Sequence, residues 1–218
     1  LYRQGALPTD EAVATAMSRI ESESKRMGQL VEDLLTLARI DERRESKLAP
    51  FDLFNLAVDA TNDAYATAPD RAVSLVGLNE EVAPTSATVL GDESRLRQVV
   101  ANLLTNAMRY TPDGSPLEIA VGVREEVHGF PLSVLEVRDH GPGIHGEDRE
   151  RVFERFYRTD ASRSRETGGT GLGLSIVAAI IEQHEGRIHI EETDGGGATF
   201  VISLPFYPPP VSDDQLMK

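Results

Sequence analysis

Gly168-Gly169-Thr170-Gly171-Leu172-Gly173-Leu174 is the stretch of this sequence that says most about the fold. An apolar run, Leu174-Ser-Ile-Val-Ala-Ala-Ile-Ile181, follows it directly and predicts a helix over residues 172–184. Glycines let a backbone approach a ligand closely. The first amides of a helix are unpaired and lie at the positive end of its dipole. The two features together predict a seat for a phosphate group.

The helix predicted over residues 92–110 has an apolar face and an amide face. The apolar face predicts a buried stripe, which consists of Leu96, Val99, Val100, Leu103, Leu104 and Ala107. Gln98, Asn102 and Asn106 recur every four residues on the other side, and Arg109 and Tyr110 end the helix. Amide oxygens suit Mg²⁺, an arginine can meet phosphate oxygens and a tyrosine can stack on a base. A polar helix face whose amides have no role is the alternative.

Asp139 ends a strand predicted over residues 133–139 and falls on the same face as Leu135 and Val137. A carboxylate that points inward needs a strong donor. The exocyclic amine of adenine could serve, with Gly141 and Gly143 leaving room for the base; a salt-bridged carboxylate at a strand end is the alternative. Residues 141–146 also match the dinucleotide-binding fingerprint, but no helix and second parallel strand follow, which excludes that fold.

A polar, arginine-rich segment over residues 145–170 predicts a long loop. It is interrupted by Phe153-Glu-Arg-Phe156-Tyr157-Arg158, whose aromatic residues indicate a hydrophobic latch on a lid. Arg158, Arg163 and Arg165 are candidate phosphate contacts, and solvated surface charges are the alternative.

Composition excludes several classes of protein. The net charge of −14, from 22 basic and 36 acidic residues, argues against a nucleic-acid partner. The absence of cysteine excludes disulfides and thiolate catalysis. No Gly-Lys-Ser/Thr occurs and no lysine lies between residues 48 and 217, which excludes a P-loop and a protein-kinase strand lysine. No apolar run approaches the roughly 20 residues that span a bilayer.

Residues 8–45 predict one long amphipathic helix. Its apolar seam has heptad spacing, is widened by Leu30 and Leu37, and consists of Val13, Met17, Ile20, Ser24, Met27, Val31, Leu34 and Ala38. Such a seam must be covered, either by the rest of one globular domain or by the other helices of a dimeric bundle. The second interpretation is favoured because residues 1–7 look like the end of a preceding helix and its turn.

A charged segment that ends at Pro50 predicts a domain boundary. We expect a partial helical hairpin over residues 1–48, a second domain over 49–207 and a flexible tail over 208–218. Within the second domain, a helix from Phe51 to about Tyr65 precedes short strands over 71–76 and 86–90, and further strands follow over 117–123, 187–192 and 198–204. Helices and strands do not alternate regularly, which favours an α+β fold with a mixed sheet.

Four segments in this order resemble the catalytic domain of sensor histidine kinases. They are Asn102-Leu-Leu-Thr-Asn106-Ala-Met-Arg109-Tyr110, Asp139-His-Gly141-Pro-Gly143-Ile, Phe153-Glu-Arg-Phe156-Tyr-Arg and Gly169-Thr-Gly171-Leu-Gly173-Leu. The resemblance covers roughly residues 50–205, and Met27–Arg39 is similar to the second helix of the family's dimerisation and phosphotransfer hairpin. It implies a two-layer α/β sandwich of the histidine-kinase, gyrase and chaperone ATPase type. It also implies a homodimer, a response regulator as partner, and a cytoplasmic place within a bacterial inner-membrane sensor.

The resemblance further implies that the domain binds ATP and Mg²⁺. Asn106 matches the Mg²⁺ ligand, Asn102 assists at the phosphates, and Arg109 stands where the family often has lysine. Tyr110 and Asp139 match the adenine contacts. The implied catalytic residues are Asn102, Asn106 and Arg109, and the implied nucleotide-binding residues add to them Tyr110, Asp139, Gly141, Gly143, Gly169, Thr170, Gly171, Leu172, Gly173 and Thr199. The residues themselves indicate only packing for Thr199.

One departure from the family concerns the phosphoacceptor histidine, which lies in a His-Glu-Leu-Arg-Thr-Pro-Leu-like segment of the first hairpin helix. This sequence has no such segment, and its five histidines all lie in the catalytic region. We therefore expect the sequence to start after the acceptor helix and not to phosphorylate itself. The alternatives are an ATP-binding module and a hydrolysing ATPase of the gyrase and chaperone type. Those ATPases carry a glutamate where this chain has Asn102, which is no general base.

Overall fold

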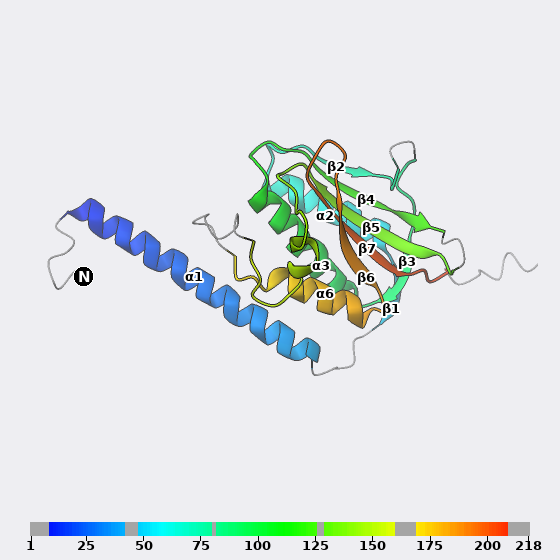
Figure 1. The fold of residues 1–218 in the computed structure, drawn as a ribbon, viewed down its shortest axis with the longest axis horizontal. Coiled ribbons are helices and arrows are strands. Elements are labelled where there is room, and N and C mark those ends of the chain that lie inside the picture. Colours follow the sequence, from blue (N-terminus) through cyan, green and yellow to red (C-terminus); the bar gives the residue numbers. More distant parts are fainter. Residues whose placement is uncertain (1–8, 42–47, 80–81, 126–128, 160–168, 209–218) are drawn as a thin grey trace, which may run out of the picture.

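The computed structural model describes residues 9–41, 48–79, 82–125, 129–159 and 169–208. Three helices pack side by side on one face of a five-stranded sheet, and a long helix, α1 (Asp10–Asp41), extends away from this body (Figure 1). The predicted α+β sandwich preceded by a long amphipathic helix is confirmed.

The main sheet is mixed, as predicted. Its strand order is β2 (Val73–Val76), β4 (Leu117–Arg124), β5 (Leu132–Asp139), β7 (Ala198–Pro205) and β6 (Arg187–Glu192). β2 runs parallel to β4, and the other neighbouring pairs are antiparallel. The covering helices are α2 (Leu53–Thr67), α3 (Glu93–Tyr110) and α6 (Gly173–Gln183), and a short α4 (Asp148–Arg151) precedes α6.

The core lies between the helices and the sheet. All six residues of the predicted α3 stripe are buried, and they face buried Ile119, Leu135 and Val137 of the sheet. Because side chains alternate along a strand, Asp139 falls on the same face as Leu135 and Val137. The packing of α3 therefore places its last turns beside the end of β5.

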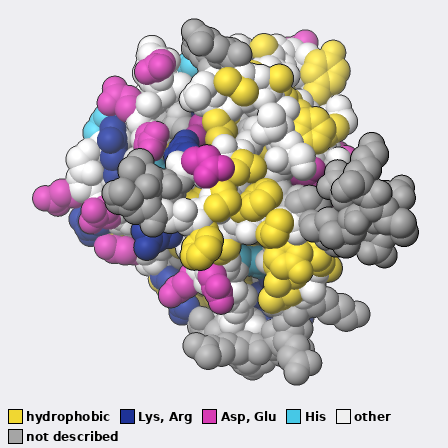
Figure 2. Space-filling model, turned by 90° about the vertical axis from the view of Figure 1, so that its right-hand side faces the viewer, with side chains coloured by type: hydrophobic (Ala, Val, Ile, Leu, Met, Phe, Trp, Pro, Cys, Tyr) yellow, Lys and Arg dark blue, Asp and Glu magenta, His cyan; other side chains and the backbone are white. Residues whose placement is uncertain are grey.

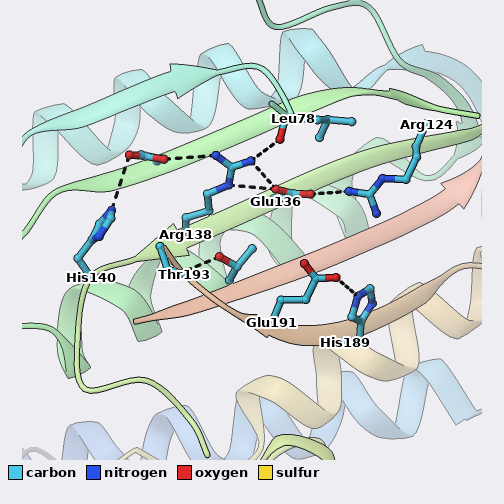
Figure 3. Close-up of polar contacts among 10 residues, drawn as sticks. Leu78, Arg124, Glu136, Arg138, His140, His189, Glu191 and Thr193 are labelled. Carbon is cyan, nitrogen blue, oxygen red and sulfur yellow. Dashed lines mark hydrogen bonds and ion pairs between the residues drawn. The ribbon is translucent and has the colours of Figure 1, made fainter. Parts of the chain in front are cut away.

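Ion pairs hold the other face of the sheet (Figure 3). The buried Glu136 carboxylate accepts from Arg124 at 2.9 Å and from Arg138 at 2.7 Å. Arg138 also donates to the Leu78 carbonyl at 2.8 Å. These charges serve the fold and lie on the face opposite to Asp139.

A strand that the sequence did not predict, β1 (Ala49–Asp52), pairs antiparallel with β3 (Thr88–Gly91) in a small second sheet. Pro50 was expected to mark a boundary before a helix from Phe51. Proline lacks an amide but is tolerated in edge strands, so β1 forms first and α2 starts at Leu53. Figure 2 shows the molecule from the right-hand side of Figure 1, where hydrophobic side chains gather on the surface. Leu48, just before β1, and Leu90 of β3 are exposed.

Among the described residues, helix α1 packs on the body of the domain through its C-terminal half. Leu37 and Ile40 are buried and Leu30 is partly buried there, and the Gln183 side chain of α6 donates to the Ile40 carbonyl at 2.7 Å. The predicted seam is largely exposed on this chain, most clearly at Met17, Ile20, Met27, Val31 and Leu34. Leu30 and Leu37 therefore belong to the face that packs on the body. None of the helices in the described ranges has the length and apolarity needed to cross a bilayer.

Asp52 joins β1, α2 and the segment before β3. Its carboxylate accepts from the Phe54 amide at 2.9 Å, which caps α2, and from the Ala87 amide at 2.8 Å. Burial raises the pKa of Asp52, but hydrogen bonds from Ser86, Ala87 and Phe54 outweigh it and leave that pKa below its ordinary value. A lowered pKa means that Asp52 stabilises the fold above its ordinary pKa and loses that effect as the pH falls through its lowered pKa.

We expect Asp52→Ala to lower the free energy of unfolding by about 2 kcal/mol at pH 7, because a cap and a second amide partner are lost together. Urea denaturation at pH 7 and pH 3 measures this, and the difference from the unchanged chain shrinks at the lower pH. Asp63→Ala, which truncates an exposed carboxylate of α2, is the control and changes little. An equal loss from both variants would contradict the capping role.

Candidate functional site

The amide face of α3 forms one wall of the candidate site. Asn102 and Asn106 are half-buried, whereas Gln98 and Arg109 are exposed. The Asn102 amide lies 3.5 Å from the Gly173 carbonyl at the start of α6. No hydrogen bond between described residues uses the Asn106 side chain, so its oxygen is available to a cation.

The second glycine segment lies against the C-terminal end of α3. A Cβ atom added to Gly169 would lie 2.6 Å from Arg109 Nη1 and 3.9 Å from the Tyr110 hydroxyl. Gly171 has a φ of +74°, and its carbonyl accepts from the Phe156 amide at 3.0 Å. No side chain caps the N-terminus of α6 at Leu172. The first amides of α6 therefore remain available to an anion, as the predicted phosphate seat requires.

Asp139 lies beside Gly141 and close to Thr111, the residue that follows α3. Its Oδ1 accepts from the Gly141 amide at 2.9 Å and from the Ala198 amide at 3.3 Å. Among the described residues, none donates to Oδ2. A Cβ on Gly141 would lie 2.9 Å from Thr111 Cγ2 and 3.1 Å from Asp139 Oδ1. A side chain at residue 141 would therefore crowd Thr111 and the Oδ1 atom of Asp139, while Oδ2 has no donor among the described residues.

Burial raises the pKa of Asp139 above its ordinary value, although the Gly141 and Ala198 amides and the charges of His140 and Arg71 lower it. A carboxyl with a raised pKa stabilises the fold fully below its ordinary pKa and loses that effect as the pH rises through the raised pKa. The ionised form at neutral pH is therefore costly to the folded protein. Ionisable groups with a perturbed pKa are typical of functional sites.

We expect Asp139→Asn to raise the unfolding free energy of the ligand-free chain at pH 7 by on the order of 1 kcal/mol, the usual gain from relieving a destabilised site group. The neutral amide mimics the protonated carboxyl, so the gain disappears in acid, below about pH 4. Thermal unfolding at pH 7 and pH 4 measures it, with the exposed Asp113→Asn as control. A lower melting temperature for Asp139→Asn than for the unchanged chain at pH 7 would contradict the prediction that the ionised Asp139 side chain destabilises the fold.

Thr199 is a described residue whose side chain the structure does not bring to the site. It is paired with Arg138 across β5 and β7, so its side chain points to the face opposite Asp139. Its hydroxyl lies 2.9 Å from that of Thr193 (Figure 3). The neighbouring Ala198, which the sequence reasoning missed, reaches Asp139 through its backbone amide. Because the contact is made by the backbone, no side-chain pattern could have revealed it.

Gly143 and Gly197 close the loop beside Asp139. Gly143 has a φ of +72°, and a Cβ atom there would lie 2.9 Å from the Gly197 carbonyl. Gly197 has a φ of +126°, and its own Cβ would lie 1.9 Å from the Asp139 carbonyl. Only glycine allows this approach, so Gly143 and Gly197 shape the loop next to Asp139.

Aromatic contacts hold the described part of the segment between the two glycine segments against the core. Phe153 and Tyr157 pack on the core, which supports the predicted latch, and the Tyr157 hydroxyl donates to Asp148. Phe156 instead is 60% exposed with a φ of +65°. Arg158 is half-buried, whereas Arg163 and Arg165 lie outside the described residues.

Asp33 of α1 reaches the site, which the sequence reasoning also missed. Its carboxylate is buried and accepts from the Thr170 hydroxyl at 2.7 Å and from the Gln29 amide at 2.8 Å. The signal was the spacing of Leu30, Asp33, Leu37 and Ile40, which places an acidic residue on a helical stripe that is otherwise apolar. Thr170 of the second glycine segment is thereby tied to α1 in this structure.

Comparisons with known proteins agree with this geometry. Residues 91–208 match the family described as histidine kinase-, DNA gyrase B- and HSP90-like ATPases. The probable sensor histidine kinase TcrY of Mycobacterium tuberculosis is 44% identical over 196 residues, which cover 89% of this chain and 39% of TcrY. The sensor-like histidine kinase SenX3 of Mycolicibacterium smegmatis is 36% identical, over 93% of this chain and 50% of SenX3. The chain thus spans half or less of the length of these relatives.

Solved structures show the same likeness. The mycobacterial sensor histidine kinase MprB superposes with a TM-score of 0.62 at 27% identity, over 74% of this chain and all of that one. Full-length ShkA in complex with AMPPNP superposes with a TM-score of 0.70 at 28% identity, over 92% of this chain and 40% of that one. The chain belongs to the family of histidine kinase-, DNA gyrase B- and HSP90-like ATPases, and it carries the ATP-binding catalytic domain of a sensor histidine kinase.

Proposed function

We propose that this domain binds Mg-ATP at the C-terminal half of α3 and transfers the γ-phosphoryl group to a histidine outside this sequence. The observation that carries the proposal is that this half of α3 contacts both glycine segments. Asn102 lies at Gly173, and Arg109 lies at Gly169. Thr111, which caps the same helix, lies at Gly141. A base at Asp139 and phosphates at the start of α6 would thus lie at two ends of one site.

Each residue has a proposed part in this site. Asp139 accepts from the adenine amine, Tyr110 stacks on the base, and Gly141 and Gly143 leave room for it. Asn102, Arg109 and the second glycine segment hold the phosphates, with contacts from Gly169, Thr170, Gly171, Leu172 and Gly173. Asn106 holds Mg²⁺, which when bound neutralises charge on the phosphate oxygens. Thr199 is left out of the set because its side chain lies on the other face of the sheet.

Catalysis in this proposal consists of positioning and charge neutralisation. A neutral imidazole nitrogen of the acceptor attacks the γ-phosphorus, the bond to the oxygen bridging the β- and γ-phosphates breaks, and ADP leaves. No observation favours hydrolysis. The position that carries a glutamate in the related ATPases is Asn102 here, and an amide cannot accept a proton from water.

The partners follow from the same proposal. The acceptor histidine lies on a helix of the longer kinase, and its phosphoryl group passes to a response regulator. The exposed seam of α1, with Met17, Ile20, Met27, Val31 and Leu34, packs in the bundle of a homodimer. We place this domain in the cytoplasmic portion of an inner-membrane sensor.

Label transfer from ATP tests the proposed function. With ATP labelled at its γ-phosphate, we expect this chain alone to take up no stable label. We expect it to label a separate fragment that carries the acceptor-histidine helix, and not the same fragment with that histidine replaced by glutamine. Stable self-labelling of this chain, or release of free phosphate at the rate of ATP consumption, would refute transfer to an external histidine.

A further inference from the structure

Arg71 is a buried cation whose partners are all neutral. It lies in the turn between α2 and β2 and is 6% exposed. Its Nη1 donates to the Thr111 hydroxyl at 2.5 Å, and its Nη2 donates to the Pro112 carbonyl at 3.0 Å. None of the ion pairs between described residues includes Arg71. A guanidinium stays charged in proteins, and a buried charge is costly without an opposite charge nearby.

Arg71 is connected to Asp139 through two intervening groups, Thr111 and Gly141. Thr111, held by Arg71, also donates to the Ala107 carbonyl at 2.7 Å and so fixes the end of α3. Its methyl group lies 2.9 Å from the position of a Cβ on Gly141, and the Gly141 amide donates to Asp139 at 2.9 Å. Burial and the Gly141 and Ala198 amides have the largest effects on the pKa of Asp139, and the charge of Arg71 is a smaller influence that favours the ionised form.

Among the described residues, two side chains lower the pKa of Asp139 through their charge. Arg71 approaches from the turn before β2, and His140 is the next residue of the chain. The His140 ring lies 3.6 Å from Glu118, whose side chain is on the face of the sheet opposite to Asp139 (Figure 3). Arg71 is the partner whose charge does not change with pH.

We propose that Arg71 is a positioning and specificity-determining residue for the purine, because it holds Thr111 beside Gly141 and keeps a permanent positive charge near the carboxylate that meets the base. This rests on the proposed contact between Asp139 and adenine. An ionised carboxylate only accepts hydrogen bonds, so it binds the exocyclic amine of adenine and repels the O6 oxygen of hypoxanthine. A protonated carboxyl can donate a hydrogen bond to O6 and therefore tolerates hypoxanthine. The charge supplied by Arg71 therefore selects the amino-purine.

The dissociation constants of Mg-ATP and Mg-ITP, measured by calorimetry between pH 5 and pH 8, test this role. In Arg71→Gln we expect the pH below which ATP binding weakens to rise by about one unit, because a charge that lowers the pKa of Asp139 is gone. At pH 6 the preference for ATP over ITP falls about tenfold, which equals about 1.4 kcal/mol. Arg71→Lys keeps the positive charge. We expect it to retain the midpoint, which is the pH at which half of the ATP affinity is lost, and the preference for ATP over ITP, although it binds ATP more weakly.

Three further variants serve as controls. Arg124→Gln removes one positive charge from the opposite face of the sheet and leaves the midpoint unchanged. His140→Gln removes the other side chain whose charge acts on Asp139, and so separates its effect from that of Arg71. Asp139→Ala reports on the base contact itself: if it binds ATP like the unchanged chain, the proposed site is wrong, whatever Arg71 does.

If Asp139→Ala loses ATP while Arg71→Gln keeps the wild-type midpoint and preference, Arg71 has only a structural role and the inference is overturned. Equal weakening of ATP and ITP at every pH overturns it too. Circular dichroism shows which variants are folded. Should Arg71→Gln not fold, Arg71→Lys decides, because a midpoint displaced by a full unit despite the retained charge contradicts the inference.

Discussion

Asp139→Ala is expected to weaken the binding of Mg-ATP by at least about 100-fold, which corresponds to about 2.7 kcal/mol. The variant removes the acceptor for the adenine amine, and it also leaves the Gly141 and Ala198 amides without their shared acceptor. The loss of a hydrogen-bonding partner inside a dry site is costly, because the remaining polar groups stay unpaired. Calorimetric titration with Mg-ATP at pH 7.5 measures the effect.

The matched control is Glu118→Ala, which removes a carboxylate from the neighbouring strand on the opposite face of the sheet. It should bind Mg-ATP within about twofold of the unchanged chain, as a substitution away from the site. Asp139→Ala must also unfold cooperatively, so that lost binding is not lost folding. Near-equal affinities of Asp139→Ala and the unchanged chain would remove Asp139 from the site.

Asn106→Ala is expected to lower the rate of label transfer to the acceptor fragment by about 100-fold or more, the usual effect of losing one preorganised electrostatic group. The amide oxygen of Asn106 has no partner among the described residues, so its removal leaves the fold intact. The substitution removes the proposed Mg²⁺ ligand and leaves the proposed contacts with the adenine base in place. We therefore expect the affinity for ATP measured in EDTA to stay within a few-fold of the unchanged chain.

Gln98→Ala truncates another amide of α3, two turns earlier and exposed to solvent, and it should transfer label at the normal rate. Rate measurements across a Mg²⁺ titration distinguish a metal ligand from a general helix effect, because a lost ligand raises the Mg²⁺ concentration needed for half-maximal transfer. A rate for Asn106→Ala equal to that of Gln98→Ala would rule out Asn106 as the metal ligand.

The sequence predicted the elements whose residues carry a strong pattern. The α3 stripe and the alternation of β4 and β5 were correct because burial of one face imposes a period of 3.6 or 2 on the apolar residues. The same alternation correctly places Asp139 on the inner face of the sheet, together with Leu135 and Val137. The second glycine segment was predicted to sit at the start of a helix, and α6 begins at Gly173.

The features that the sequence could not predict depend on contacts between distant residues. β1 was missed because Pro50 is a breaker in most settings, and only pairing with β3 at a sheet edge makes it compatible with a strand. Thr199 was predicted to contact the nucleotide, but its neighbour Ala198 is the residue that reaches Asp139. Successive residues of a strand face opposite sides of the sheet, so an error of one residue puts the side chain on the wrong face. Asp33 and Arg71 act through Thr170 and Thr111, 137 and 40 residues away in the chain.

A crystal structure of this chain with Mg²⁺ and AMPPNP tests most directly whether α3, Asp139 and the second glycine segment form one nucleotide site. We predict that the adenine amine lies within hydrogen-bonding distance of Asp139 Oδ2 and that Mg²⁺ is bound by the Asn106 oxygen. We also predict that the phosphates contact the amides at the start of α6, while Thr199 keeps its contact with Thr193. A nucleotide whose base lies away from Asp139, or whose phosphates lie away from Gly169–Gly173, would contradict this assignment.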